Sequence, residues 1–284
     1  MRTIKRIHEA VSAPIADLVT YRALPTNSID HIDPFLFLNH HGYQVYPKNN
    51  RGLPFGPHPH RGFETVTFIL KGDLAHKDSS GAESVIEAGG VQWMTAGKGL
   101  IHAEVSSDMF MENGGELEIL QLWVNLPAKF KMITPKYIGL QKEQIPVAEL
   151  DKGKVTIDAV SGDWEGAKGA FTPLADIELA TLRFAEGGTF KISIPAERNI
   201  FFYVIKGSVQ VNGEQVKMHQ LAEFDNDGSK IKIEASEESI VLFGHALPFN
   251  EPIVAQGPFV MNTEEEIMQA YQDYRNGKFG SWRE

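Results

Sequence analysis

Cysteine is absent from all 284 residues, which excludes disulfide bonds, thiolate metal ligands and cysteine nucleophiles. Long apolar runs are missing as well, because no stretch approaches the roughly 20 residues that span a bilayer. The basic N-terminal segment does not develop into an apolar signal sequence, since His8, Glu9 and Asp17 interrupt it. We therefore expect a cytoplasmic protein without a membrane anchor.

The chain also has fewer positively than negatively charged residues. The chain has 27 Lys and Arg residues against 37 Asp and Glu residues, a formal net charge of -10. Nucleic-acid binding depends largely on Lys and Arg side chains that displace counterions from phosphates. Direct nucleic-acid binding is therefore not expected, and small molecules or proteins are the favoured partners.

Short segments rich in Val, Ile, Phe and Thr recur between turns rich in Gly, Asp, Asn and Ser, the pattern of a β-sandwich or barrel. The clearest predicted strands are 63–71, 117–125, 200–206 and 239–243. A strand, a glycine turn and a second strand follow one another at 68–76 and again at 203–211, a weak internal repeat. We predict an all-β protein built from two antiparallel, jelly-roll β-barrels.

The length of 284 residues favours two domains, since one domain typically has about 150 residues. The stretch 127–179 is rich in Pro and Gly and is interpreted as a connector that contains the boundary. We predict an N-terminal domain of residues 1–134 and a C-terminal domain of residues 135–284. The second domain includes a short C-terminal helix, which begins after Thr263 with Glu266 completing a capping box and ends at Arg275 or Asn276, before Gly277.

Two residue pairs carry the chemistry. One residue separates His58 from His60, and one residue separates His102 from Glu104. Residues two apart on a strand point to the same side, so each pair can direct two ligands at one point inside a barrel. Three imidazoles and a carboxylate suit one divalent non-haem metal ion, with Fe(II), Ni, Cu, Zn, Mn and Co all open. The spacing leaves open whether Glu64 or Glu104 supplies the carboxylate.

The C-terminal half repeats neither pair. Its segment 196–205 contains no histidine, and neither His219 nor His245 has a possible ligand two residues away. We therefore predict one metal ion per chain, bound in the N-terminal barrel, and a C-terminal barrel without a metal site.

The surroundings of the two pairs resemble the two motifs of the cupin family. Residues 58–64 (HPHRGFE), followed by an apolar strand and Gly72, are similar to the first motif. Residues 97–102 (GKGLIH) are similar to the second, in which a Pro-x-Gly turn precedes a histidine ligand. The sequence departs from the family in two ways: Gly97 replaces the proline, and the gap from Glu64 to Gly72 is one residue longer.

A closer resemblance is to the pirins, which are bicupins. It covers essentially the whole chain, most weakly at 135–200. It rests on DPFLFLNHHG (33–42), GPHPHRGFETVTFILKGDLAHKDSSG (56–81), QWMTAGKGLIHAE (92–104), LQLWVNLP (120–127) and EPIVAQGPFVMNTEEEIMQAYQDYRNGKFG (251–280).

The resemblance implies a ligand set and a reaction. The ligands are His58, His60, His102 and Glu104, with Glu104 and not Glu64 as the carboxylate. Bacterial pirins imply a dioxygen-dependent opening of a flavonol such as quercetin, which releases carbon monoxide and a depside, and Fe(II) is the metal that we favour. Glu104 is then also the catalytic residue, transiently taking the proton of the flavonol 3-hydroxyl. Eukaryotic pirins imply an alternative, a metal- and redox-dependent regulator that acts through protein partners.

Other polar and aromatic residues are interpreted from their local pattern. His76, at a predicted strand end, is expected to be a hydrogen-bonded structural residue in preference to a partner of the metal ligands. His40 and His41 are predicted in a loop. Glu64 keeps two roles open, acceptor for a ligand histidine or solvated strand residue, and Trp123 is predicted in the core.

Overall fold

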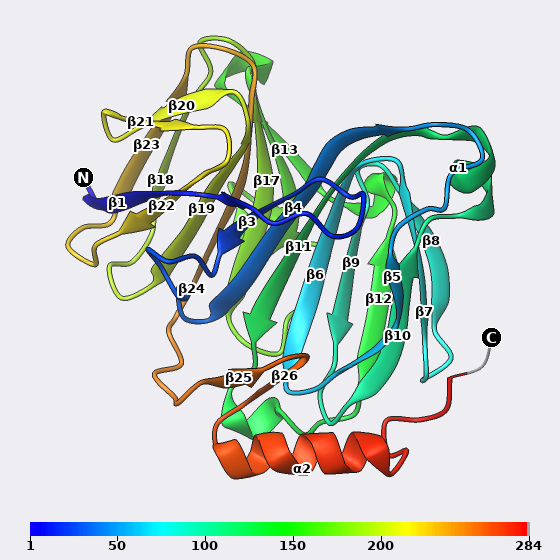
Figure 1. The fold of residues 1–284 in the computed structure, drawn as a ribbon. Helices are drawn as coiled ribbons and strands as arrows, with labels where there is room; N and C mark the ends of the chain where they lie inside the picture. The colour runs from blue at the N-terminus through cyan, green and yellow to red at the C-terminus, as the bar shows by residue number, and fades with distance from the viewer. Residues whose placement is uncertain (283–284) are drawn as a thin grey trace. The chain divides into compact units, whose positions relative to one another are not determined.

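The structure is a computed structural model that describes residues 1–282. Strands dominate these residues, which contain two α-helices (Figure 1), so the all-β prediction is confirmed. No helix among them combines the length and the apolarity needed to cross a membrane. The chain forms two compact units. Unit 1 comprises Met1–Val11, Tyr21–Phe37 and Glu143–Phe249, and unit 2 comprises Ser12–Thr20, Leu38–Lys142 and the chain from Asn250 onward.

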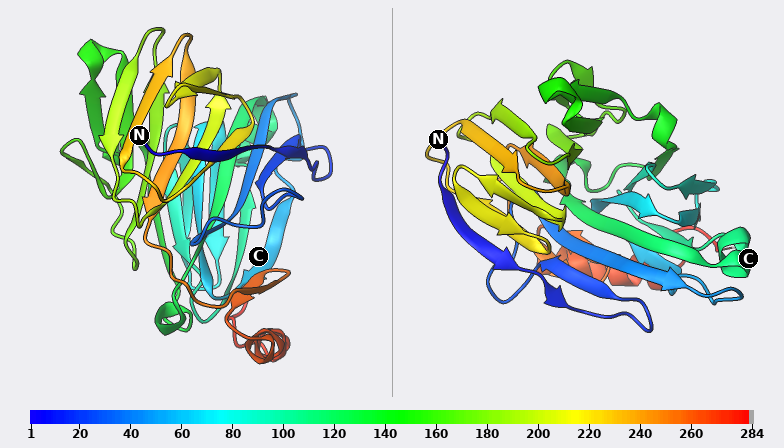
Figure 2. Two further views of the ribbon diagram at one scale, coloured as in Figure 1. Left: turned by 90° about the vertical axis from the view of Figure 1, so that its left-hand side faces the viewer. Right: turned by 90° about the horizontal axis from the view of Figure 1, so that it is seen from above.

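The two units interleave along the chain, and this grouping differs from the contiguous domains 1–134 and 135–284 that we expected. Strand β1 (Ile4–Glu9), at the start of the chain, pairs with β22 (Gln220–Phe224) in unit 1 (Figure 2). The C-terminal helix α2 (Glu264–Arg275) lies in unit 2, together with the segment that contains the predicted ligands. Each unit thus takes strands from distant parts of the sequence.

Unit 1 contains two antiparallel sheets and a short hairpin. The first sheet has the strand order β1, β22, β19 (Asn199–Lys206), β24 (Ser239–Ala246), β17 (Ile177–Phe184), β14 (Val155–Ser161), β13 (Val147–Leu150). The second has the order β18 (Thr189–Ser193), β23 (Lys230–Ala235), β20 (Ser208–Val211), β21 (Glu214–Lys217), and the hairpin pairs β15 (Asp163–Trp164) with β16 (Ala167–Lys168). Alternate residues of β19, namely Ile200, Phe202 and Val204, enter one buried apolar cluster. The interior of unit 1 is therefore hydrophobic at these positions.

Most strands of the other two large sheets belong to unit 2, but Val11 and residues 21–24 and 35–37 of the first of these sheets are grouped with unit 1. One has the order β12 (Lys136–Leu140), β9 (Val91–Thr95), β6 (Phe63–Lys71), β11 (Gly115–Asn125), β4 (Phe35–Tyr46), β3 (Thr20–Leu24), β2 (Val11–Ser12). The other has the order β5 (Phe55–His60), β10 (Leu100–Val105), β7 (Asp73–Asp78), β8 (Glu83–Glu87). A hairpin of β25 (Val254–Gln256) and β26 (Phe259–Met261) and helix α1 (Asp108–Asn113) complete the unit, and short 3-10 turns lie at Ala128–Phe130, Lys142–Gln144 and Asp151–Gly153 of the chain.

The interior of unit 2 is only partly apolar. Ile69, Leu74, Ile86 and Ile119 belong to one buried cluster of this unit. Two residues before Ile69, the same face of β6 carries Thr67, which lies opposite Gln121 of β11 and Gln92 of β9. Polar residues therefore replace apolar ones along the same strand faces, and they surround the predicted metal ligands.

Helix α2 agrees with its sequence signals. The Thr263 hydroxyl accepts a hydrogen bond from the Glu266 amide, and the Glu266 carboxylate accepts one from the Thr263 amide, so the predicted capping box is confirmed. The helix ends at Arg275, and Gly277 adopts a φ of 73° just beyond it. It lies beside β25 and β26, at one end of the strands of unit 2 (Figure 1).

Candidate metal centre

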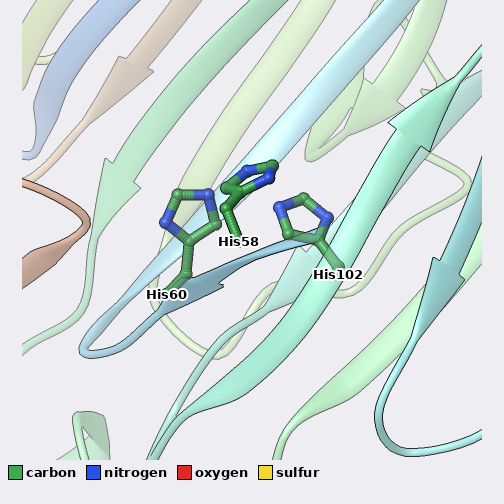
Figure 3. A group of neighbouring side chains, drawn as sticks. All are labelled: His58, His60 and His102. Carbon is green, nitrogen blue, oxygen red and sulfur yellow. The ribbon is translucent and has the colours of Figure 1, made fainter. Parts of the chain in front are cut away.

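The predicted histidines lie on two neighbouring antiparallel strands. The register of β5 and β10 places His58 directly opposite His102. The ring centroid of His102 lies 4.4 Å from that of His58 and 4.9 Å from that of His60. Figure 3 shows the three imidazoles turned toward one another. One nitrogen of each ring lies within 4.8 Å of a nitrogen of the other two, close enough for all three to reach one ion.

Backbone carbonyls orient two of these rings. The Nδ1 atom of His58 lies 2.7 Å from the Gly56 carbonyl oxygen, and Nδ1 of His60 lies 3.3 Å from the Pro258 carbonyl oxygen. Because a carbonyl only accepts hydrogen bonds, Nδ1 carries a proton in both rings, and in the neutral form of each ring the lone pair is then on Nε2. This tautomer is the one in which Nε2 binds a metal ion.

His102 is the most buried of the three rings, and no described residue offers a hydrogen bond to either of its nitrogens. Burial, and then the neighbouring imidazoles, lower the pKa of His102 well below its usual value, and burial lowers the pKa of His60 to about 3. Both rings are therefore neutral, as metal ligands must be. A buried polar atom without a partner costs about 1 to 3 kcal/mol. A metal ion bound by His102 removes that cost, so the residues present fit the predicted ion.

Glu104 belongs to a second group of possible ligands. A carboxylate oxygen of Glu104 and one nitrogen each of His76 and His102 lie within 4.8 Å of one another, and all three residues are buried. The four predicted ligands thus fall into two overlapping groups that share His102. Glu104 therefore lies beside the three-histidine group, and His102 is the residue of that group whose ring is near its carboxylate.

The Glu104 carboxylate is held by three donors. The side-chain amides of Gln92 and Gln121 donate to Oε1 and Oε2 respectively, the second over 2.5 Å. The Thr67 hydroxyl donates to Oε1 over 3.2 Å. A carboxylate has about four lone-pair directions, so about one remains for an ion or a proton.

Each of the two glutamines is oriented in turn by an aromatic residue. The Tyr137 hydroxyl donates to Oε1 of Gln92 over 2.9 Å, and the Trp123 indole donates to Oε1 of Gln121 over 3.3 Å. The amide nitrogen of each glutamine must then face Glu104. Trp123, which we predicted in the core, is only partly buried, and its ring centroid lies 5.3 Å from that of His60. That prediction is therefore wrong, because Trp123 lies next to the candidate site.

His76 is hydrogen-bonded as predicted, but it also faces the ligands. Its Nε2 lies 3.1 Å from Oδ2 of Asp78, and its ring stacks on Tyr137 with centroids 3.8 Å apart. Its buried Nδ1 has no hydrogen-bond partner among the described residues. A carboxylate behind an imidazole is the usual arrangement that orients a metal-binding histidine. His76 is thus a possible further ligand, which the sequence did not distinguish from a structural residue.

The structure also differs from the prediction for two neighbouring histidines. His40 and His41, predicted in a loop, are buried in strand β4. The Nε2 atom of His40 lies 3.1 Å from a Glu118 carboxylate oxygen, and Nδ1 of His41 lies 2.8 Å from the Thr20 hydroxyl. Both rings are thereby engaged away from the three-histidine group.

Glu64 occupies the opposite face of β6 from Thr67. It lies opposite Val124 and Thr95, and Thr95 donates a 2.5 Å hydrogen bond to its carboxylate. It is 1% exposed, and neither group of possible ligands includes it. Both roles that we considered are therefore wrong, since Glu64 is not solvated and it points away from the ligand histidines. Burial raises its pKa to about 7, against the opposing effect of hydrogen bonds from Thr95 and Trp93.

This shift predicts a pH-dependent stability. The folded-state pKa of about 7 lies above the ordinary value of 4.5, so the folded protein retains a proton that the unfolded chain loses between these values. The contribution of protonated Glu64 is complete below pH 4.5 and is lost as the pH rises through 7. Glu64→Gln cannot ionise, so at pH 8 we expect its free energy of unfolding to exceed that of the wild type by roughly 3 kcal/mol. Urea unfolding of both metal-free proteins at pH 5 and pH 8 tests this, and an equal difference at the two pH values would contradict it.

Comparisons with known proteins agree with this architecture. Residues 17–124 match the family model described as pirin, and residues 179–280 match that of the pirin C-terminal cupin domain. The chain belongs to the pirin family. Pirin of Homo sapiens is 34% identical over 268 residues, which cover 91% of this chain and 87% of the human protein.

Two bacterial relatives of this pirin carry the name of an enzyme. A Pseudomonas aeruginosa protein provisionally named as a quercetin 2,3-dioxygenase is 36% identical over 266 residues, covering 94% of this chain and 92% of that protein. A crystal structure named quercetin 2,3-dioxygenase, from Acinetobacter baumannii, superposes with a TM-score of 0.93 at 35% identity over 99% of each chain. The predicted family and bicupin fold are thereby confirmed.

Both groups of possible metal ligands found in residues 1–282 lie in unit 2 of this pirin. The histidine on β24 of unit 1, His245, accepts a 2.8 Å hydrogen bond from the Arg198 guanidinium at Nδ1. Burial, followed by the charge of Arg198, lowers the pKa of His245 to about 3. Its Nδ1 is therefore engaged with a cation.

Proposed function

We propose that this pirin is a metal-dependent dioxygenase that opens flavonols of the quercetin type. The observation that carries the proposal is the convergence of three imidazoles, two of them buried and neutral, beside a buried, firmly held carboxylate. The names of the two bacterial relatives support the substrate class. The products expected are a depside and carbon monoxide.

His58, His60, His102 and Glu104 would hold one divalent ion, and Fe(II) is the ion that we propose. Such an ion supplies a Lewis acid that acidifies the flavonol 3-hydroxyl and a redox centre for dioxygen chemistry. The four side chains would hold the ion, and the chemistry that it would supply is the activation of substrate and dioxygen. His58 is only partly buried, so this side of the group provides access for a substrate.

Glu104 is the residue that accepts the 3-hydroxyl proton in this proposal. Three donors fix its carboxylate, so the one lone pair that remains would bind the ion and the proton in turn, with the proton coming from a group within hydrogen-bonding distance. Trp123 presents a partly buried aromatic ring beside His60, a surface on which a planar flavonol can stack. Proton transfer and aromatic positioning thus come from residues on the interior face of unit 2.

The proposal predicts turnover only in the metal-loaded protein. The protein is stripped with a chelator, reloaded anaerobically with Fe(II), and mixed with a panel of flavonols while dioxygen uptake and carbon monoxide are measured. We expect carbon monoxide release in proportion to flavonol loss, with about one Fe per chain by elemental analysis. Equal turnover by the stripped protein would show that the reaction does not use the metal. If every metal form is inert toward flavonols but one iron oxidation state binds a protein partner, the regulatory role replaces the enzymatic one.

A further inference from the structure

The C-terminal segment lies against the turn that follows the first ligand pair. The Pro258 carbonyl accepts hydrogen bonds from the ring of His60 and from the Arg61 amide, both over 3.3 Å. The Val260 amide donates to the Arg61 carbonyl over 3.0 Å. Pro258 and strand β26, which begins directly after it, therefore fix both the tautomer of His60 and the backbone that follows it.

The Arg61 side chain connects helix α2 to the second ligand-bearing segment. Its Nη1 donates to Oδ2 of Asp273 over 2.9 Å, and its Nε donates to the Lys98 carbonyl over 2.7 Å. The guanidinium lies 4.6 Å from the ring centroid of Phe279. Lys98 belongs to the turn that leads to His102, so one buried cation joins the segments that carry His60 and His102 to the C-terminal segment.

Phe279 makes a second connection to the His102 segment. Its carbonyl accepts a 2.6 Å hydrogen bond from the Ser79 hydroxyl, and the Ile101 amide donates to that same hydroxyl over 3.0 Å. Its ring covers Gly99, where a Cβ atom would lie only 2.7 Å away. The backbone immediately before His102 is thus held by the C-terminal segment on two sides.

Lys131 also binds the turn that follows His60, at residues 61 and 62, and the C-terminal segment. Its buried ammonium donates to the carbonyl oxygens of Gly62 and Val260 over 2.8 and 3.1 Å and to Oδ1 of Asn125 over 2.7 Å. Burial lowers the pKa of Lys131 to about 8. Three acceptors for three donor hydrogens tie β26 to the residue that follows Arg61.

We propose that the C-terminal segment 258–279 positions His60 and His102 for metal binding, with Arg61 and Asp273 as the positioning residues. The inference rests on the metal centre proposed above, and it assigns part of that centre's affinity to residues that do not touch the ion. Metal affinity depends on ligands held in place before the ion arrives. Loss of the Arg61–Asp273 pair frees the segments that carry His60 and His102. The entropy lost when these segments become ordered then reduces the free energy of metal binding.

The test is Co(II) binding to the full chain, with three single variants. Asp273→Asn removes the charge that holds Arg61. Arg61→Lys keeps the positive charge but cannot reach Asp273 and the Lys98 carbonyl with one fork of donors. Glu265→Gln is the matched control, because it removes one negative charge from an exposed position of the same helix. Co(II) affinity is measured by competition with a chelator, the ligand-field spectrum reports coordination geometry, and thermal unfolding of the metal-free protein reports stability.

We expect Asp273→Asn and Arg61→Lys to bind Co(II) about tenfold more weakly, the lower end of the effect of outer partners of metal ligands, and to show a changed ligand-field spectrum. Glu265→Gln should match the wild type in both. Unchanged affinity and spectrum in the first two variants, even with a lower unfolding temperature, would reduce the segment to a structural role and overturn the proposal. If Asp273→Asn does not fold, Arg61→Lys decides between these outcomes. A wild type that binds no Co(II) would instead refute the metal centre itself.

Discussion

His102→Ala is expected to abolish tight metal binding. His102 belongs to both groups of possible ligands, and no described residue provides a hydrogen bond to either of its ring nitrogens. Its loss therefore removes the ligand that connects His58 and His60 to Glu104. The affinity for Fe(II) or Co(II) should fall by more than the roughly 10 to 100-fold that is typical when an outer partner is removed. Chelator competition with the wild type as reference measures the change.

The metal-free variant should nevertheless remain folded. Removal of an imidazole with unsatisfied nitrogens offsets part of the cost of the cavity that alanine leaves. Far-UV circular dichroism should match that of the metal-free wild type, because apolar clusters stabilise both units. His76→Ala is the comparison variant: if His76 only orients the ligands, its loss should fall within the 10 to 100-fold range, about that of an outer partner. A loss as large as that of His102→Ala would place His76 among the ligands, and unchanged affinity in His102→Ala would show that the ion binds elsewhere.

The parity of strand residues predicted that His58, His60 and His102 point to one place, and the structure brings the three rings together, while their role as ligands stays a prediction. His58, His60 and His102 converge because two antiparallel strands in register bring positions of one face together. The same argument could not place Glu64, because residues 61 and 62 form a turn between β5 and β6. The alternation of side-chain directions along β5 does not continue through that turn into β6. The Glu64 carboxylate therefore faces away from the site.

The grouping of strands into units could not be predicted in the same way. The pairing of β1 with β22 joins residues more than 200 positions apart, for example Ile7 with Ala222. Local patterns contain no information about such a partner. The ends of helix α2 were predicted to within one residue from its capping box and terminal glycine, yet those signals describe only its ends and not the unit against which it packs.

The polar residues around Glu104 were missed although a signal was present. Thr67, Gln92 and Gln121 each stand within an otherwise apolar strand, at positions where a barrel interior requires burial. A buried amide or hydroxyl must have a hydrogen-bond partner, so such residues predict a polar group beside them. At the interior positions of β19 in unit 1, Ile200, Phe202 and Val204 create no such requirement. The contrast between the two interiors, more than the histidine count, identifies the unit that can hold an ion.

Glu104→Gln should lower flavonol turnover by about 10² to 10⁴-fold at saturating Fe(II), the contribution typical of general acid–base catalysis. The amide has nearly the same shape, but it cannot take the 3-hydroxyl proton. Its NH₂ group would also face the donors of Gln92 or Gln121, so the carboxamide cannot keep all the hydrogen bonds that fix the carboxylate. Turnover is followed by carbon monoxide release, with the Fe content of each sample measured so that weaker metal binding is separated from the loss of the base.

Glu64→Gln is the matched control, because it makes the same chemical change on the opposite face of β6. Glu64 lies outside both groups of possible ligands, so its variant should retain turnover within a few-fold of the wild type at pH 7. The two variants decide between the carboxylate of the first cupin motif and the one that follows His102. If Glu64→Gln abolishes turnover and Glu104→Gln does not, the catalytic carboxylate is Glu64, and unit 2 must rearrange β6 to bring it to the histidines. If both variants are as active as the wild type, neither carboxylate takes the proton, and the 3-hydroxyl must ionise without a protein base.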